Sequence, residues 1–171
     1  MSALDIADAS AADVAAVTAV LNDAILHTTA VWYADVKSVD EIRTWWEGRV
    51  RDGFPVLVAR RAGSVVGYAT YGPFRAWPGY RATVEHSVYV DAACRRGGGG
   101  RALLTALLAR ARADGMHAMV GGIEAGNEAS LALHRALGFR EVARMPEVGQ
   151  KFGRWLTLVF METVLDARPA P

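Results

Sequence analysis

The sequence predicts an α/β (α+β) fold, a mixed central β-sheet with helices on both faces, in a single domain spanning residues 1–171. Three observations support this prediction. The length is usual for one domain, and 52% of the residues are apolar, enough for a substantial core. Segments with helical spacing of apolar residues alternate with short β-branched runs. Two of these runs are joined like a hairpin, so the sheet is not purely parallel.

Two helices are expected at the start of the chain. The motifs Ser10-x-x-Asp13 and Ser38-x-x-Glu41 have the spacing of capping boxes, in which side chains satisfy the first N–H groups of a helix. Apolar residues follow each motif at helical spacing. Gly53 stands where the second helix should end.

Three strands are expected next. Residues 54–74 hold two β-branched runs around Ala62-Gly63-Ser64, which predicts a β-hairpin. Residues 72–81 contain Pro and Gly at close intervals and are expected to form a loop. In residues 82–90 the side chains alternate, so Glu85 and His86 should point to opposite faces of a third strand.

The rest of the chain alternates helix and strand. A leucine-rich helix follows four consecutive glycines and ends at Gly115, and residues 116–124 predict a strand. Asn127 opens a further helix that Gly138 closes, and residues 154–165 predict the last strand. The predicted order is therefore α-α-β-β-β-α-β-α-β.

The composition excludes several functional classes. A net charge of +1 gives no excess that would favour nucleic acid or an anionic membrane surface as partner. Cys94 is the only cysteine and is read as structural; it cannot form an internal disulfide, which favours a reducing compartment, the cytoplasm. No signal pattern and no apolar run of about 20 residues is found, so no membrane span is expected. The four histidines lack the spacing of metal ligands, and we expect no metal.

The four glycines, residues 97–100, indicate an anion site. The first N–H groups of a helix have no internal acceptor, and glycines let a phosphate approach them closely. Arg95, Arg96 and Arg101 flank the glycines and can pair with phosphate oxygens. The alternative is a flexible turn with surface arginines.

The glycine loop can be set against three known phosphate-binding motifs. The absence of Gly-Lys-Ser/Thr excludes a Walker loop. Gly97-x-Gly99-x-x-Ala102, with Glu124 downstream, matches a dinucleotide fingerprint, but a preceding hairpin does not suit a doubly wound half-sheet. Arg95-x-x-Gly98-x-Gly100 resembles the Arg/Gln-x-x-Gly-x-Gly/Ala pyrophosphate loop of the GNAT acetyltransferase superfamily, although Arg96 replaces the usual glycine.

Other segments extend this resemblance over residues 6–165. GNEASLALHRALGF, residues 126–139, is similar to the Asn…Gly-Phe segment of the superfamily. TVEHSVYVDAACR, GIEAGNEASLALHRALGF and VGQKFGRWLTLVFM together resemble the phosphinothricin acetyltransferase branch, and residues 71–88 are more similar to its methionine sulfone and methionine sulfoximine enzymes. The resemblance implies a GNAT fold that transfers acetyl from acetyl-CoA to the α-amino group of such an amino-acid analogue. Direct attack in a ternary complex is the implied mechanism.

The resemblance also implies roles for individual residues. Glu85 is the implied general base, because an α-ammonium must lose a proton before it attacks a thioester; the alternative is a solvated glutamate at the edge of the sheet. His134 replaces the superfamily tyrosine that protonates the departing thiolate; it could be this acid, or only orient Asn127 or Ser130 on the same helical stripe. Acetyl-CoA is expected between the strands of residues 82–90 and 116–124. Its implied contacts are Val88, Tyr89, Val90, Arg95, Arg96, Gly97, Gly98, Gly99, Gly100, Arg101, Asn127 and Ser130.

The amino-acid substrate needs a partner for its carboxylate. Arg75 and Arg81 are candidates, with a surface charge as the alternative for each. Trp32 and Tyr33 could add an apolar wall. The implied substrate contacts are Phe74, Arg75, Ala76, Arg81, Val84, Glu85 and His86, and the alternative for His86 is a structural, satisfied histidine.

The family implies a homodimer, in which KFGRW, residues 151–155, could reach the partner's site; the alternative there is a strand start with a packed tryptophan. Two rival functions stay open: acetylation of another amine, such as a protein N-terminus or a polyamine, and non-catalytic binding of CoA or a dinucleotide. Arg75 and Arg81 disfavour a polyamine, whose site should be acidic.

Overall fold

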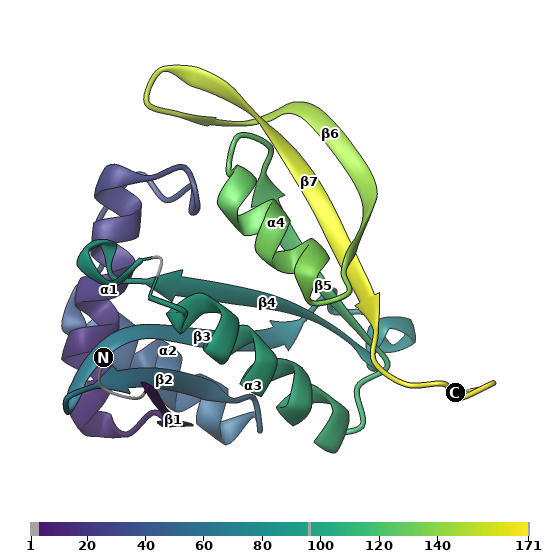
Figure 1. The fold of residues 1–171 in the computed structure, drawn as a ribbon, viewed down its shortest axis with the longest axis horizontal. Helices are drawn as coiled ribbons and strands as arrows, with labels where there is room; N and C mark the ends of the chain where they lie inside the picture. The colour runs from purple at the N-terminus through teal and green to yellow at the C-terminus, as the bar shows by residue number, and fades with distance from the viewer. Residues whose placement is uncertain (1–3, 96, 171) are drawn as a thin grey trace. The chain divides into compact units, whose positions relative to one another are not determined.

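A computed structural model of the chain describes residues 4–95 and 97–170. Figure 1 shows the succession of elements. The strands are β1 (Leu4–Asp8), β2 (Val56–Arg61), β3 (Ser64–Pro73), β4 (Thr83–Val90), β5 (Ala118–Glu124), β6 (Arg140–Lys151) and β7 (Arg154–Val164). The α-helices are α1 (Val14–His27), α2 (Val39–Arg51), α3 (Gly99–Ala113) and α4 (Glu128–Ala136), with short 3-10 turns at Ala11–Asp13, Pro78–Tyr80 and Ala92–Cys94. The strand order is β1-β2-β3-β4-β5-β7-β6, with parallel and antiparallel neighbours, so the predicted mixed sheet is confirmed.

The chain forms two compact units, which are described separately. Unit 1 comprises the described residues up to Tyr71 together with Ser87–Leu107. Unit 2 comprises Gly72–His86 together with the described residues from Leu108 onward. That residues 1–171 form a single domain stays a prediction.

In unit 1, strands β1, β2 and β3 form an antiparallel ladder. The predicted hairpin is confirmed, because Ala62 and Gly63 join β2 to β3 with positive φ angles of 49° and 83°, as a tight turn between antiparallel strands requires. The sequence does not predict β1. Its five residues carry two aspartates and no marked apolar alternation, and main-chain pairing with β2 holds them.

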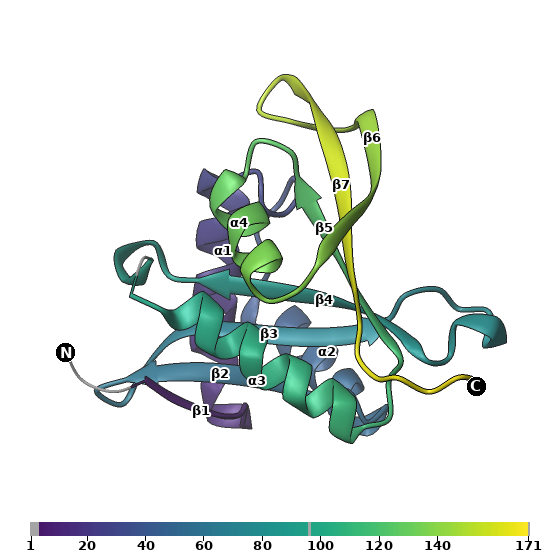
Figure 2. The ribbon, with the colours of Figure 1, turned by 45° about the vertical axis from the view of Figure 1, so that its right-hand side comes forward.

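Helices α1 and α2 bury their apolar stripes against one face of these strands. Figure 2 shows α2 behind β2 and β3, with the start of α3 in front of them. The buried cluster under the first two helices consists of Val14, Val17, Val20, Leu21, Ile25, Ile42, Val56, Val58 and Tyr68. This packing confirms the helical spacing that predicts both helices.

Both capping boxes are present. The carboxylate of Asp13 accepts hydrogen bonds from the N–H and the hydroxyl of Ser10, at 2.7 and 2.8 Å. At the start of α2, the hydroxyl of Ser38 accepts from the N–H of Glu41, and the Glu41 carboxylate accepts from the N–H of Ser38. Residues that are close in sequence make these contacts, which is why the sequence predicts them.

A glycine lets β4 approach β3 on the face opposite α1 and α2. A Cβ on Gly67 would lie 2.7 Å from the carbonyl oxygen of Tyr89 and 3.2 Å from Cδ1 of Leu103. Leu103 and Leu104 of α3 are fully buried in this layer. Position 67 therefore has no room for a side chain.

In unit 2, β5 runs parallel to the first half of β4, through pairs from Thr83–Ala118 to His86–Gly121. It is antiparallel to β7, which pairs on its other side with β6. Figure 1 shows β6 and β7 as a long twisted ribbon. The sequence does not predict β6, because its residues are mostly exposed and no apolar alternation marks it.

The last strand begins at Arg154, as predicted, but a packed tryptophan there is wrong, because Trp155 is 66% exposed. None of the helices in the described part of the chain combines the length and apolar composition that a membrane crossing requires.

Candidate active site

The glycine loop forms the start of α3 in unit 1. The helix begins at Gly99, within the glycine run rather than after it as the sequence predicts, and its first bond joins the N–H of Ala102 to the carbonyl of Gly98. Gly98 has a φ of +83°, which side chains rarely adopt. The N–H groups that precede the first bond have no acceptor within the helix. The end of the loop therefore presents main-chain N–H donors and the partial positive charge of a helix N-terminus.

The arginines around the loop differ in their surroundings. Arg95 is engaged elsewhere, since it donates to a carboxylate oxygen of Asp23 at 3.2 Å and to the carbonyl of Val90 at 3.3 Å. Arg101 is exposed in the first turn of α3 and makes no ion pair with any residue that the structure describes. Arg96 lies outside the described residues.

A further arginine contacts the loop from β2. Nη2 of Arg61 donates to the carbonyl of Gly97 at 2.8 Å, and a Cβ on Gly97 would lie 2.8 and 2.9 Å from the two terminal nitrogens of this guanidinium. The sequence does not indicate this contact, because the two residues are 36 positions apart and nothing local marks Arg61. A glycine at 97 thus leaves room for the Arg61 guanidinium, and it is also favoured for an anion.

Glu85 lies on β4 in unit 2 with its side chain 37% exposed. Burial raises the pKa of its carboxyl group above the ordinary value of 4.5, and the nearby charge of Arg75 opposes this rise. Nη1 of Arg75 is 3.9 Å from Oε2 of Glu85, and the guanidinium stacks 4.0 Å from the ring centre of Phe74. The structure therefore brings Arg75 and Glu85 together, whereas Arg81 is exposed and makes no ion pair among the described residues.

His86 and His134 form a buried pair in unit 2, with rings stacked 5.0 Å apart. Nδ1 of His134 lies 2.7 Å from the carbonyl of Ser130, which only accepts, so this nitrogen carries the proton. Nε2 of the neutral His134 ring then accepts, and Nε2 of His86, 3.1 Å away, donates. The other nitrogen of His86, Nδ1, is buried and has no hydrogen-bond partner among the described residues.

Both imidazoles are held neutral. Desolvation lowers the pKa of His86 to about 3, with a further contribution from His134, and desolvation also lowers the pKa of His134. The pairing links β4 to α4, two elements that the sequence does not connect. His86 is buried as the strand alternation predicts, but only one of its two nitrogens is satisfied.

The polar stripe of α4 is confirmed. Oδ1 of Asn127 accepts from the N–H of Ser130 at 3.2 Å, so Asn127 caps the helix as predicted. The hydroxyl of Ser130 lies 3.4 Å from Nδ1 of His134. Both ring nitrogens of His134 are therefore occupied within unit 2, which favours an orienting role over protonation of a thiolate.

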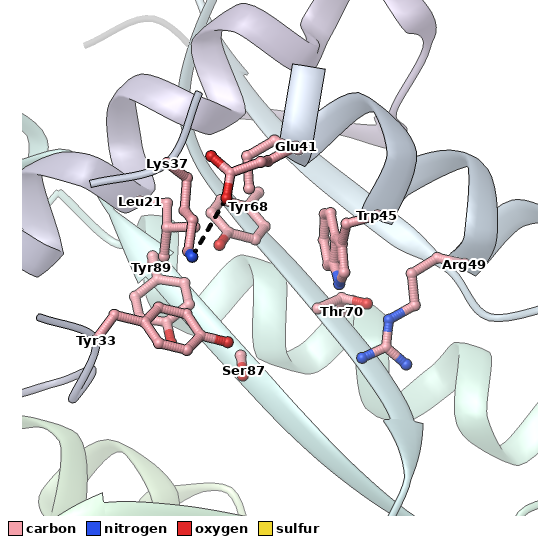
Figure 3. A pocket seen from close by; sticks show the side chains of 11 residues that line it. Leu21, Tyr33, Lys37, Glu41, Trp45, Arg49, Tyr68, Thr70, Ser87 and Tyr89 are labelled. Carbon is pink, nitrogen blue, oxygen red and sulfur yellow. Dashed lines mark hydrogen bonds and ion pairs between the residues drawn. The ribbon is translucent and has the colours of Figure 1, made fainter. Parts of the chain in front are cut away.

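Unit 1 holds a cavity of about 310 Å³ beneath α2, shown in Figure 3. It is lined by Leu21, Tyr33, Lys37, Glu41, Ile42, Trp45, Arg49, Tyr68, Thr70, Ser87 and Tyr89. Of the two aromatic residues predicted to form a wall, Tyr33 lines this cavity and Trp32 does not; the Trp32 indole donates to the carbonyl of Thr29. Within the described residues, no group of three His, Cys, Asp or Glu side chains is arranged to hold a metal ion.

Comparison with known proteins shows the family of the chain. Residues 20–139 match the acetyltransferase (GNAT) family. The chain belongs to the GNAT acetyltransferase family. The superfamily that the glycine loop and the Asn…Gly-Phe segment predict is confirmed, and the chain is an acetyltransferase by family.

Individual relatives indicate which branch of the family this acetyltransferase resembles most. It is 51% identical to an L-methionine sulfoximine/L-methionine sulfone acetyltransferase of Pseudomonas paraeruginosa, over 97% of this chain and 98% of that protein. It is 35% identical to a phosphinothricin N-acetyltransferase of Alcaligenes faecalis, over 91% and 79%. The predicted order of similarity, sulfone and sulfoximine enzymes before phosphinothricin enzymes, is confirmed.

Solved structures agree with the fold. The structure of yncA from Salmonella typhimurium, determined with its cofactor acetyl-CoA, matches with a TM-score of 0.96 and 49% identity over 99% of this chain and 98% of that one. A ribosomal-protein-alanine N-acetyltransferase from Brucella melitensis matches with a TM-score of 0.92 and 51% identity over 94% and 99%. The predicted GNAT fold is confirmed.

Proposed function

We propose that this acetyltransferase transfers acetyl from acetyl-CoA to the α-amino group of methionine sulfone or methionine sulfoximine, with phosphinothricin as a less favoured analogue. The observation that carries the proposal is the identity of 51% to an enzyme named for these substrates, over 97% of the chain. The half-buried carboxylate of Glu85, beside a cation that suits an amino-acid carboxylate, supports it.

Acetyl-CoA supplies the reactive thioester, and the residues around the glycine loop fit its pyrophosphate. The bare main chain at the start of α3 offers N–H donors, and the exposed Arg101 adds positive charge. We assign the pyrophosphate to Arg96, Gly97, Gly98, Gly99, Gly100 and Arg101, with Arg95 contributing its main chain because its guanidinium pairs with Asp23. The thioester arm is assigned to the main chain of Val88, Tyr89 and Val90 with Asn127 and Ser130. The alternative of a mere surface turn accounts for the glycine at 97 through Arg61, but not for the run of four glycines at the start of a helix.

Glu85 accepts the proton of the substrate ammonium, directly or through water, and the freed amine attacks the thioester carbonyl in a ternary complex. The amine nitrogen adds to the carbonyl carbon and the bond from carbon to sulfur breaks. The second proton that the nitrogen loses goes to the departing thiolate, so the products are the N-acetyl amino acid and the free thiol of CoA. Glu85 must be ionised to accept the proton, so kcat/KM should fall as the pH drops through its raised pKa.

Arg75, with Arg81 as the second candidate, is assigned to the substrate carboxylate. The remaining substrate contacts are proposed to come from the main chain of Phe74, Ala76, Val84 and His86. His134 is proposed to orient the first turn of α4 through the carbonyl of Ser130 rather than to act as an acid.

Replacing Glu85 by Gln tests the base. The E85Q variant should lose about 100-fold or more of thiol release from acetyl-CoA with methionine sulfone, while calorimetry finds nearly unchanged acetyl-CoA affinity. Glu47→Gln, at an exposed site on α2, is the matched control. Full turnover in E85Q at neutral pH would remove Glu85 from this role, and parallel double-reciprocal kinetics would remove the ternary complex.

A second candidate function is acetylation of a protein N-terminus. The name of the Brucella melitensis structure, 51% identical to this chain, favours testing it. Thiol release with an alanyl peptide should be far slower than with methionine sulfone. The reverse order would make the protein N-terminus the substrate.

We further propose that the enzyme is a cytoplasmic homodimer. Several large apolar side chains of the ribbon formed by β6 and β7 are exposed, among them Val148, Phe152 and Trp155, and such side chains are typical of an interface. The lone Cys94 suits a reducing compartment. Light scattering should give twice the chain mass, and Trp155→Glu should shift the mass toward the monomer; a wild-type monomer would contradict the proposal.

A further inference from the structure

The cavity of unit 1 contains a cation, Arg49, that has no counter-ion among the residues that the structure describes. The guanidinium of Arg49 is half-buried and, among the described residues, makes one hydrogen bond, from Nη1 to the carbonyl of Tyr71 at 3.3 Å. It faces the rings of Trp45 and Phe54, 5.8 and 5.7 Å from their centres, and forms no ion pair with a described carboxylate. A half-buried guanidinium with most of its N–H donors unused by the protein can take up an acceptor oxygen.

A second donor lies beside it. The indole N–H of Trp45 makes no hydrogen bond with the described residues, and Figure 3 shows this nitrogen on the same side of the cavity as Thr70 and the Arg49 guanidinium. The hydroxyl of Thr70 already donates to the carbonyl of Pro55 at 2.8 Å. This end of the cavity therefore offers the unused donors of Trp45 and Arg49 to an incoming oxygen atom.

The remaining walls are apolar or neutralised. Leu21, Ile42 and the ring of Tyr68 supply apolar surface. Lys37, the other cation of the cavity, is 3.5 Å from Glu41 and lies over the ring of Tyr33. Within the described part of the chain Lys37 has a counter-ion and Arg49 has none, so Arg49 is the cation of the cavity that can take up an acceptor.

We propose that this cavity is the specificity pocket for the oxidised end of the substrate side chain, an inference that rests on the proposed function. One oxygen of the sulfone, sulfoximine or phosphinate accepts hydrogen bonds from Arg49 and Trp45, and the methyl group packs against the apolar walls. Such oxygens carry partial or full negative charge and only accept hydrogen bonds, so they match the end of the cavity where Trp45 and Arg49 offer N–H donors. Unoxidised methionine lacks them and would leave both donors unpaired.

Two variants test the pocket. Trp45→Phe keeps the ring and removes the N–H, and Arg49→Gln removes the cation; Arg51→Gln, an exposed arginine on the same helix, is the matched control. Kinetics are measured with methionine sulfone and with methionine, and circular dichroism checks folding. Both test variants should raise KM for the sulfone at least tenfold and lower the preference for sulfone over methionine by a similar factor, with acetyl-CoA affinity unchanged. R51Q should keep the wild-type preference.

The outcomes separate the two proposals. Sulfone acetylation by the wild type, with an unchanged KM and preference in W45F and R49Q, overturns the pocket and leaves the proposed function standing. If only R49Q fails to fold, W45F decides. A wild type that releases no thiol with either amino acid overturns the proposed function and the pocket with it.

Discussion

The buried histidine pair should make the protein sensitive to mild acid through one identified group. An unfolded histidine has a pKa near 6.5, whereas burial lowers the pKa of His86 to about 3. The folded state therefore resists a proton that the unfolded state binds, and stability that is present above pH 6.5 is lost as the pH falls toward 3. Between pH 7.5 and 5.0, His86 alone should remove about 2 kcal/mol of the free energy of unfolding.

The variant His86→Gln isolates this contribution. Gln keeps a side-chain N–H that can reach His134 but does not titrate, so its loss of stability between the two pH values should be about 2 kcal/mol smaller than that of the wild type. In urea unfolding followed by tryptophan fluorescence, this corresponds to a difference of about 1 M in the shift of the midpoint. Each protein is its own reference, so a constant offset from altered packing does not affect the comparison.

An exposed histidine supplies the control. His27→Gln on α1 leaves the buried pair intact and should keep the wild-type acid response. If H86Q and the wild type lose the same stability between pH 7.5 and 5.0, His86 binds a proton in the folded state as readily as in the unfolded one, and the neutral, stacked pair described here is wrong.

Three further outcomes follow from single contacts. Ser38→Ala removes the cap of α2 and should cost about 1 kcal/mol in unfolding experiments; an unchanged midpoint would mean that the cap is replaced by water. Gly67→Ala places a Cβ 2.7 Å from a main-chain oxygen and should lower stability by about 1–3 kcal/mol, whereas a gain would show that β4 can move away. Burial raises the pKa of Asp13, but donors from Ser10 and Arg60 outweigh it and lower the pKa overall, so Asp13→Asn should destabilise at pH 7 and the deficit should shrink as the pH falls below about 4. A deficit that stays constant with pH would contradict that reasoning.

Features of the fold that depend on neighbouring residues could be predicted from the sequence. The capping boxes, the Ala62–Gly63 turn, the capped start of α4 and the glycine loop are all set by side chains within a few positions of each other. Strand β6 could not be predicted, because an edge strand that is exposed along most of its length has no buried face to impose alternation.

The candidate site also combines features that local sequence predicts with features that depend on distant residues. Glu85 and the stripe from Asn127 to His134 follow from strand and helix periodicity, together with the family resemblance. The pairing of His86 with His134 joins residues 48 positions apart. Whether Arg49 meets a carboxylate among the described residues depends on the other elements that line the cavity. Only the folded chain shows such relations, because no local pattern encodes which distant group will be a neighbour.

The contact between Arg61 and Gly97 ties the loop proposed to bind the pyrophosphate to the hairpin formed by β2 and β3. A residue inserted between positions 62 and 63 would move the main chain of Arg61. The hydrogen bond to the Gly97 carbonyl would then be displaced, and the glycine loop would change shape although its own sequence is intact. An insertion at this turn should therefore weaken the binding of acetyl-CoA more than it weakens folding, although nothing in the linear sequence marks the turn as important.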